Sequence, residues 1–481
     1  MKHLLLSLFL LLTIFYSNAQ NVGIGTAAPA EKLHVTGNIK SDTIKVNGIK
    51  LPPDAGEGKI LTSDAAGNAS WQDGGRIAGN IGYGVWGDCA TNASISEFQP
   101  VVDSVDEFDR LGQCVAISGN FAVLGAPGAN VNGNNGQGSA IIYEFNGSKW
   151  VFKQKIYDLA GELSDQFGNA VAIAGNYIVI GCASDNVGAV SNQGSVSIYR
   201  NNGTSWVFMQ KLTDASGAAA DLFGSSIAIF GNSIIAGSPG DDVGTSIDEG
   251  SASIYRFNGT FWVLVQKITD VLGAAGDRFG SSVAISATYA FAGSPSETGT
   301  AGVDDNRGSV AVFLNNGTTT PMIQRLIDDD SQGGDKFGSA IAVSGNDLII
   351  GAETDDVLSN PAQGSVVFFK YTGSSWQQVE KFTDVLGEAG DNLGNVVAIS
   401  GNYAMAGVYL DDVGANPNQG TAFLFQKVGN YWRKLQQITD PGAGYNDAFG
   451  SGVAIDGVNR RFLVGSMRVH ESGGGFFGKV H

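Results

Sequence analysis

The chain has 481 residues, of which only 15% are charged and 69 are glycine, and its formal net charge at pH 7 is −18. Many glycines and few charged residues favour short strands joined by tight turns over long helices. The acidic balance argues against a nucleic-acid partner, which would require a basic surface, and it favours divalent cations or basic partners instead.

Residues 1–19 have the pattern of a secretory signal peptide. Lys2 precedes an apolar run that is too short for a membrane-spanning helix, and Ser17 and Ala19 provide the small residues that a cleavage site after Ala19 needs. No later segment has an apolar run long enough to span a membrane. We therefore expect a secreted protein, extracellular or at the outer cell surface, with no transmembrane segment in the mature chain.

Residues 20–72 differ in pattern from the rest of the chain. They contain short apolar alternations such as KLHV and TIKV, but too little apolar bulk for a core of their own. The phrases NVGIGTAAPAEKLHV and GKILTSDAAGNASWQ resemble the tail-fibre-like N-terminal modules of exported Bacteroidetes proteins. We expect a β-rich stalk that needs a partner surface, either the rest of the chain or further copies in a homotrimer. A Gly-rich linker follows over residues 73–93.

From residue 94 onward the chain is built from a repeat. The phrase Asp-x-Phe/Leu-Gly returns seven times, and the spacing of its glycines is 56 residues five times and 58 once. A period of this length is typical of repeat architectures such as propellers. The glycines are Gly112, Gly168, Gly224, Gly280, Gly338, Gly394 and Gly450.

Each repeat contains four strand-like stretches. In the third repeat, three of them lie within residues 225–257 and the fourth begins at Trp262. Asn258-Gly259 joins the last two, and Asn-Gly is a strong hairpin signal because both residues tolerate positive φ. Four antiparallel strands in each of seven repeats predict an all-β fold, a seven-bladed β-propeller of four-stranded blades over residues 94–481.

Two features concern contacts between blades. The fourth strand begins with tryptophan in five repeats, and we interpret these side chains as packing between blades rather than as ligand platforms. After Gly450 the last repeat has sequence for only three strands, whereas residues 94–103 align with the fourth strand of other repeats. We therefore predict that residues 94–103 add a closing strand to the last blade, which removes a free sheet edge. The tryptophans are Trp150, Trp206, Trp262, Trp376 and Trp432.

The residues around the first two strands of each repeat resemble those of FG-GAP repeats. Phe-Gly precedes the first strand, and sequences such as Gly125-Ala126-Pro127 follow the second. The pattern is similar to integrin α N-terminal propellers and closer to secreted bacterial FG-GAP proteins. This resemblance implies a seven-bladed propeller, an extracellular location and a role in cell adhesion or ligand binding. Integrin repeats carry calcium loops between the first and second strands, but here that connection is a tight turn such as Gly231-Asn232, so those calcium sites cannot be transferred.

Aspartates gather instead at the other end of the strands. Two of them, seven residues apart, stand before the first strand in six repeats, and one or two more follow the second strand in several repeats. Because these positions lie at the same end of an up-and-down blade, we expect one strongly acidic face. Carboxylate oxygens suit Ca²⁺, but aspartate also caps turns by hydrogen-bonding its own loop, and both interpretations stay open. The candidate Ca²⁺ ligands are Asp328, Asp329, Asp330 and Asp335, with Asp241, Asp242, Asp355, Asp356, Asp411 and Asp412.

No catalytic motif is found in the sequence. The chain has only four histidines, and it contains neither a Gly-x-Ser-x-Gly nucleophile elbow nor a phosphate-binding Gly-rich loop. We therefore expect no enzyme, no catalytic residues and no cofactor other than Ca²⁺. The function that we expect is a non-enzymatic binding or adhesion module of the bacterial surface, with a protein or glycan ligand on the acidic face. The alternatives are a secreted carbohydrate-active hydrolase that uses paired aspartates and a structural spacer protein.

Overall fold

The computed structural model describes residues 22–24, 33–35, 59–63, 69–73, 109–297, 306–317, 320–440, 443–467 and 479–480. The chain divides into two compact units, Met1–Asn80 and Ile81–His481. The first unit has two small sheets, in which β1 (Val22–Ile24) pairs in parallel with β2 (Leu33–Val35) and β3 (Lys59–Ser63) pairs antiparallel with β4 (Ala69–Asp73).

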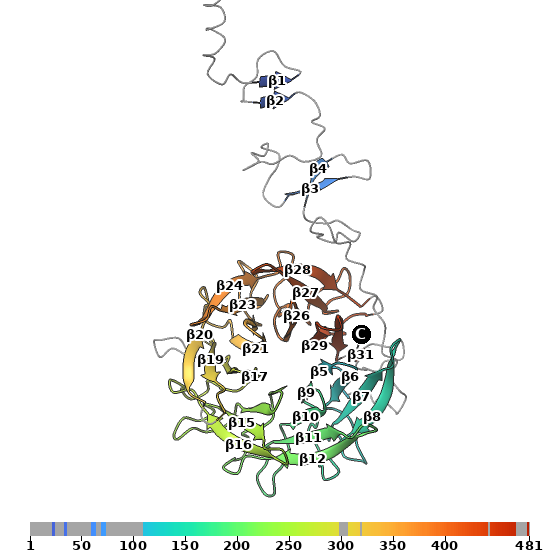
Figure 1. Ribbon diagram of the computed structural model, residues 1–481, viewed down its shortest axis with the longest axis vertical. Helices are drawn as coiled ribbons and strands as arrows, with labels where there is room; N and C mark the ends of the chain where they lie inside the picture. Colours follow the sequence, from blue (N-terminus) through green and yellow to red (C-terminus); the bar gives the residue numbers. More distant parts are fainter. Residues whose placement is uncertain are drawn as a thin grey trace, which may run out of the picture. The chain divides into compact units, whose positions relative to one another are not determined.

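The second unit is a ring of antiparallel sheets, numbered here as blades in chain order (Figure 1). Blade one contains β5 (Val115–Ser118), β6 (Phe121–Ala126), β7 (Ser139–Phe145) and β8 (Trp150–Ile156). Blade two contains β9 (Ala170–Ala174), β10 (Tyr177–Cys182), β11 (Ser195–Asn201) and β12 (Trp206–Leu212). Blade three contains β13 (Ile227–Phe230), β14 (Ser233–Ser238), β15 (Ser251–Phe257) and β16 (Trp262–Ile268).

The remaining blades continue the same order of strands. Blade four contains β17 (Ser282–Ile285), β18 (Tyr289–Ser294), β19 (Ser309–Leu314) and β20 (Met322–Leu326). Blade five contains β21 (Phe337–Ser344), β22 (Asp347–Ala352), β23 (Ser365–Tyr371) and β24 (Trp376–Phe382). Blade six contains β25 (Val397–Ser400), β26 (Tyr403–Val408), β27 (Thr421–Val428) and β28 (Tyr431–Ile438). Blade seven contains β29 (Phe449–Asp456), β30 (Arg461–Ser466) and β31 (Lys479–Val480).

The prediction of an all-β propeller is confirmed, but its strand count needs a correction. Within the described residues, six sheets have four strands and the seventh has three, because β31 occupies the third position and no described strand follows it. Seven four-stranded blades are therefore not what the structure shows. The predicted closing strand, residues 94–103, lies outside the described residues and stays a prediction.

The position of a strand in its blade explains its burial. First strands such as β5 and β9 lie near the centre of the ring, and fourth strands such as β8 and β12 lie at the periphery (Figure 1). The second strand is covered on both faces by neighbouring blades, and all six residues of β14 are buried. The fourth strand lies at the rim of the ring, so β16 exposes Val263 and Leu264 while Trp262 stays buried.

Two glycine columns set the distance between blades. Within blade one, the amide of Gly112 donates to the carbonyl of Gly125 at 3.0 Å. A Cβ atom placed on Gly125 would lie 2.1 Å from the carbonyl oxygen of Gly168 in the connection to blade two, so only glycine permits this approach. The contact recurs around the ring. A Cβ atom on Gly465 would lie 1.9 Å from the carbonyl oxygen of Gly112, so blade seven packs directly on blade one.

The tryptophan column packs between blades, as the sequence predicts. Trp206 lies edge-on to Phe121 of blade one, with 5.3 Å between the ring centroids. Trp262 lies edge-on to Tyr177 of blade two, with 5.4 Å between the ring centroids. These contacts join the outer strand of one blade to the second strand of the blade before it, so the aromatic residues stabilise the ring.

A glutamine on the outer strand adds a polar link to each of these contacts. Gln154 Nε2 donates to the carbonyl of Trp206 at 2.9 Å, and Gln154 Oε1 accepts from the amide of Trp206 at 2.9 Å. Gln210 makes the same two bonds with Trp262. A side-chain amide thus pairs with the backbone of the next blade as a strand neighbour would. Because both groups are partly buried, the bonds are shielded from water.

Candidate functional site

The loops at one end of the strands form the acidic loop face. In blades one to six, the loop between the second and third strands meets the connection that leads into the next blade. Gln193 Nε2, for example, donates to the carbonyl of Asp214 at 2.7 Å, so both aspartate columns lie on one face, as expected. The face comprises the connections 158–165, 214–221, 270–277, 328–335 and 384–391 and the loops 185–193, 241–249, 355–363 and 411–419.

The aspartate of the Asp-x-Phe/Leu-Gly phrase caps its own loop. Asp165 Oδ2 accepts a hydrogen bond from the amide of Glu162 at 2.5 Å, and Asp221 Oδ2 accepts one from the amide of Ala218 at 2.6 Å. These are the hydrogen bonds that the turn-capping interpretation predicts. The same bond recurs at Asp277, Asp335, Asp391 and Asp447.

In blades two to five, a cation of the fourth strand joins the other acidic residues. Lys267 Nζ lies 2.7 Å from Asp214 Oδ2, before blade three, and 2.6 Å from Asp241 Oδ2, after its second strand. Burial alone would lower the pKa of Lys267, but its hydrogen bonds to the two carboxylates outweigh that effect and raise the pKa. The lysine therefore stays charged and neutralises part of the acidic cluster.

The same bridge appears in three other blades. Lys211 lies between Asp158 and Asp185 at 2.8 and 2.6 Å. Lys381 lies 2.7 Å from both Asp328 and Asp355 and 2.6 Å from Asp330. In blade four an arginine replaces the lysine, and Arg325 pairs with Asp270 and Glu297.

The structure thus distributes the candidate Ca²⁺ ligands over several blades rather than gathering them. Asp328, Asp330 and Asp355 surround Lys381, so a cation among them would have to displace that ammonium group. Asp335 caps the amide of Gln332. Asp241 pairs with Lys267, and the backbone amide of Asp329 donates to Gln378. Asp242, Asp356 and Asp412 each accept from a backbone amide six residues later, at 2.9, 2.8 and 2.7 Å.

Blade six departs from this arrangement. Gln437 stands where the other blades have lysine or arginine, and it donates to Asp411 Oδ2 at 3.2 Å. Lys434 Nζ lies 3.6 Å from Asp384 Oδ1, which is farther than the lysine–aspartate distances in the bridges of the other blades. Burial, followed by repulsion from Asp411 and Asp384, raises the pKa of Asp391 to about 7. Burial and the charge of Asp384 also raise the pKa of Asp411 to about 6. This cluster therefore takes up protons near neutral pH.

One further group has ligand-type atoms close together. Single ligand atoms of Asp165, Cys182 and Asp185 all lie within 4.8 Å of one another and are buried. Burial, with the charges of the two aspartates, raises the pKa of the Cys182 thiol, so the thiol stays protonated and donates to the carbonyl of Asp165. Lys211 already pairs with Asp185. The charge of this group is thus partly balanced within the chain.

The cations of the fourth strand are the residues that sequence reasoning missed. Each lies five residues after the position of the tryptophan column. The sequence signal that could have revealed them is a basic residue that recurs with the same period as the aspartates. They are Lys155, Lys211, Lys267, Arg325 and Lys381, and the exception in this column is Gln437.

A buried glutamine links the two loops of most blades, and blade three has a glutamate instead. Gln137 Nε2 donates to the carbonyl of Asp158 at 2.6 Å, as Gln193 does to Asp214. Glu249 occupies this position in blade three and is only 5% exposed. An ionised carboxylate cannot donate this bond. Burial, followed by the charges of neighbouring aspartates, raises the pKa of Glu249 despite its hydrogen bond with Ser246.

We expect Glu249→Gln to stabilise the protein by about 1 kcal/mol at pH 7, because the amide restores a donor for a buried carbonyl. A raised carboxyl pKa stabilises the fold below the pKa of the unfolded chain, and that contribution disappears as pH rises through the folded pKa. The gain should therefore be larger at pH 7 than at pH 4. Urea unfolding at both pH values measures it. Gln193→Glu in blade two is the matched reverse change and should destabilise the protein. If both variants are as stable as the parent protein, the argument is contradicted.

The closed ring of antiparallel blades defines the chain as a β-propeller. Its repeats match the FG-GAP repeat model over residues 103–143, 150–199, 206–255, 262–313, 322–369 and 376–425, which together cover more than half of the chain. The chain therefore belongs to the FG-GAP repeat family. A search of curated proteins gave no match. In the described part of the chain, no helix has the length and apolar character needed to cross a membrane.

Proposed function

We propose that this protein is an exported, non-enzymatic binding or adhesion module that uses its acidic loop face. An FG-GAP propeller supports a binding role in general. The observation that carries the proposal further is the exposure of aliphatic side chains at the loop tips. Val385 and Leu159 directly follow paired aspartates and are 93% and 89% exposed. They contribute nothing to the core, and we infer that they contact a partner.

The ion clusters below these tips hold the loops in place. Lys211 and Lys381 bridge two loops each, and the capping aspartates fix the connections between blades. A surface that is ordered before binding loses less conformational entropy when the partner arrives. The charged residues of these clusters therefore serve to hold the loops in place. Asp391 and Asp411 are also buried, so they do not offer the accessible carboxylate pair that a glycoside hydrolase needs.

A binding screen tests the proposal. The mature chain is immobilised and exposed to purified extracellular-matrix proteins and to a glycan panel, and we expect at least one specific ligand. The double variant Val385→Ser/Leu386→Ser should lose about tenfold or more in affinity for that ligand. Val458→Ser is the control, because Val458 is equally exposed but lies in the turn between β29 and β30 at the opposite end of the strands. A screen without any ligand, or equal losses in both variants, would contradict the proposal.

Calcium assistance is proposed for blade six. Of the candidate ligands, Asp411 belongs to the cluster whose bridging lysine is replaced by Gln437. A divalent cation could offset the charges of Asp384, Asp391 and Asp411 there, as lysine does in blades two, three and five. Millimolar Ca²⁺ should then raise the melting temperature relative to a chelator, and Gln437→Lys should abolish that rise. An unchanged melting temperature in Ca²⁺ would exclude this assistance.

A further inference from the structure

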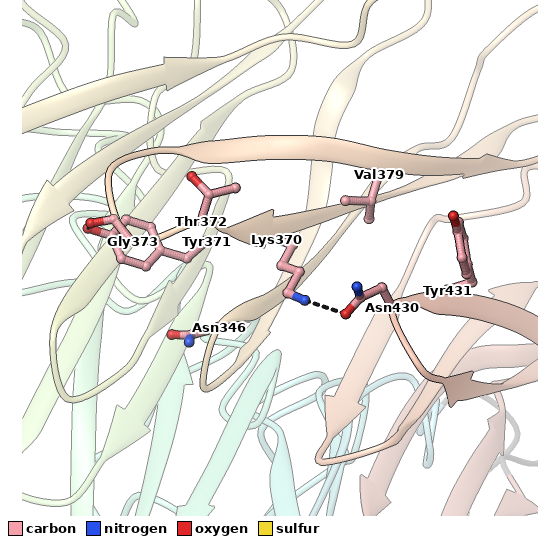
Figure 2. Close-up of a pocket in the computed structure, with 8 residues that line it drawn as sticks. All are labelled: Asn346, Lys370, Tyr371, Thr372, Gly373, Val379, Asn430 and Tyr431. Atoms are coloured by element: carbon pink, nitrogen blue, oxygen red, sulfur yellow. Dashed lines mark hydrogen bonds between the residues drawn. The ribbon is translucent and has the colours of Figure 1, made fainter.

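A groove lies between blades five and six, at the end of the strands opposite the acidic loop face. It has a volume of about 730 Å³. Figure 2 shows its lining, with Tyr371 and Tyr431 toward opposite ends and Lys370 and Asn430 between them. Asn346 and Thr372, from two hairpin turns of blade five, complete the polar part of the lining.

The groove lies beside the hairpin turns of blades five and six. The two turns have the same length, because Lys427 is paired with Trp432 five residues later, as Tyr371 is with Trp376. The chemistry of the junction differs instead. Lys427 Nζ pairs with Asp347 at 2.5 Å, where the equivalent positions at the junctions of blades two and three and of blades four and five hold aromatic pairs.

One aromatic ring of the groove is available to a ligand. Tyr431 is 64% exposed, although its neighbour Trp432 is buried between the blades. The ring of Tyr371 instead packs against Tyr289 of blade four and against Trp376, with 5.2 and 5.6 Å between the ring centroids, and its hydroxyl donates to the carbonyl of Gly373 at 3.0 Å. An aromatic ring with a polar edge offers a flat apolar face to a ligand and keeps its hydroxyl in contact with water.

The charge of the groove comes from Lys370. Its ammonium group donates to Asn430 Oδ1 at 2.7 Å, and no ion pair joins it to a carboxylate among the described residues. In this respect Lys370 differs from Lys381 and Lys427, which are paired with aspartates. A lysine with neutral partners can attract a ligand carboxylate, and the adjacent amides can donate to and accept from hydroxyl groups.

We propose that this groove binds an oligosaccharide that carries a carboxylate, such as a chain of uronic acid residues. A sugar ring would lie against Tyr431, the hydroxyls would bond to Asn346, Asn430 and Thr372, and a carboxylate would pair with Lys370. The site lies on the face opposite the loops of the proposed function and is independent of them.

The test uses the full mature chain and calorimetric titration with defined probes. Trigalacturonate and trimannuronate are compared with a neutral galactose trisaccharide and with triglutamate. We expect one of the uronates to bind at least about tenfold more tightly than the neutral sugar and triglutamate. Tyr431→Ala and Lys370→Met should each weaken that binding by about tenfold or more, and added salt should weaken the binding of the parent protein.

Two matched variants control for general effects on the fold. Phe261→Ala changes the residue of blade three that corresponds to Tyr431, and Arg200→Met changes the residue of blade two that corresponds to Lys370. Both should bind the uronate as the parent protein does. The proposal is overturned if no uronate binds at about 10 mM, if the neutral sugar binds equally well, or if the groove variants bind like the controls. Tighter binding of triglutamate would overturn it in favour of an acidic peptide site.

Discussion

Gly237→Ala is expected to destabilise the propeller by about 3 kcal/mol or more, because the new Cβ atom would overlap the backbone of the next repeat. That atom would lie 1.9 Å from the carbonyl oxygen of Gly280, and neither backbone can move without displacing a blade. Gly280 is itself held in place, since its amide donates to the carbonyl of Gly293 at 2.9 Å. Urea unfolding followed by fluorescence of the buried tryptophans measures the loss.

Gly231→Ala is the control for this prediction. Gly231 has φ of +55°, and no atom lies within 4 Å of the place that a Cβ atom would take, so alanine there adds backbone strain without overlap. Its cost should be about 1 kcal/mol. If Gly231→Ala and Gly237→Ala lose the same stability, the close approach between blades is not what requires glycine.

Gln437→Lys is expected to raise the free energy of unfolding by about 2 kcal/mol at pH 7 and by much less at pH 4. The lysine would take the place that Lys381 has in blade five and pair with Asp384 and Asp411. In the parent protein, burial and repulsion from neighbouring aspartates raise the pKa of Asp391 to about 7 and that of Asp411 to about 6. The folded state therefore binds more protons than the unfolded chain between about pH 4 and pH 7, and stability falls as pH rises through this window.

Unfolding by urea at several pH values between 4 and 8 tests the prediction. The parent protein should lose stability across the window, and Gln437→Lys should lose less of it. Lys381→Gln creates the blade-six arrangement in blade five, so it should steepen the same pH dependence. Parallel pH profiles for the parent protein and both variants would show that the bridging cation does not control these carboxylates.

The repeat made much of the fold predictable from sequence. Strand pattern and period indicate the blades, and the tryptophan column indicates the packing between them, because both depend on residues at fixed offsets within one repeat. The last blade was harder to predict. Its third strand, β31, has only two described residues, and the order of strands does not identify the segment on the side of β31 away from β30.

The candidate site was predictable only in outline. The sequence places the aspartates on one face, but not the partner of each carboxylate. Lys211 and Asp158 are 53 residues apart, and the bend of the chain from one blade into the next brings them together. The choice between turn capping and cation binding depends on that geometry. The groove at Tyr431 was missed for a similar reason, since its lining comes from the hairpin turns of two blades that only the folded ring brings together.

The glutamine links between outer strands have a mechanical consequence for the ring. A pulling force on the rim acts on the junction between neighbouring blades. At the junction of blades one and two, the two bonds of Gln154 to Trp206 and the contact of Trp206 with Phe121 would have to break together. Bonds that share a load fail at a higher force than bonds that open one after another. The rim is therefore built to resist tension, and rupture under load should begin where this pairing is incomplete.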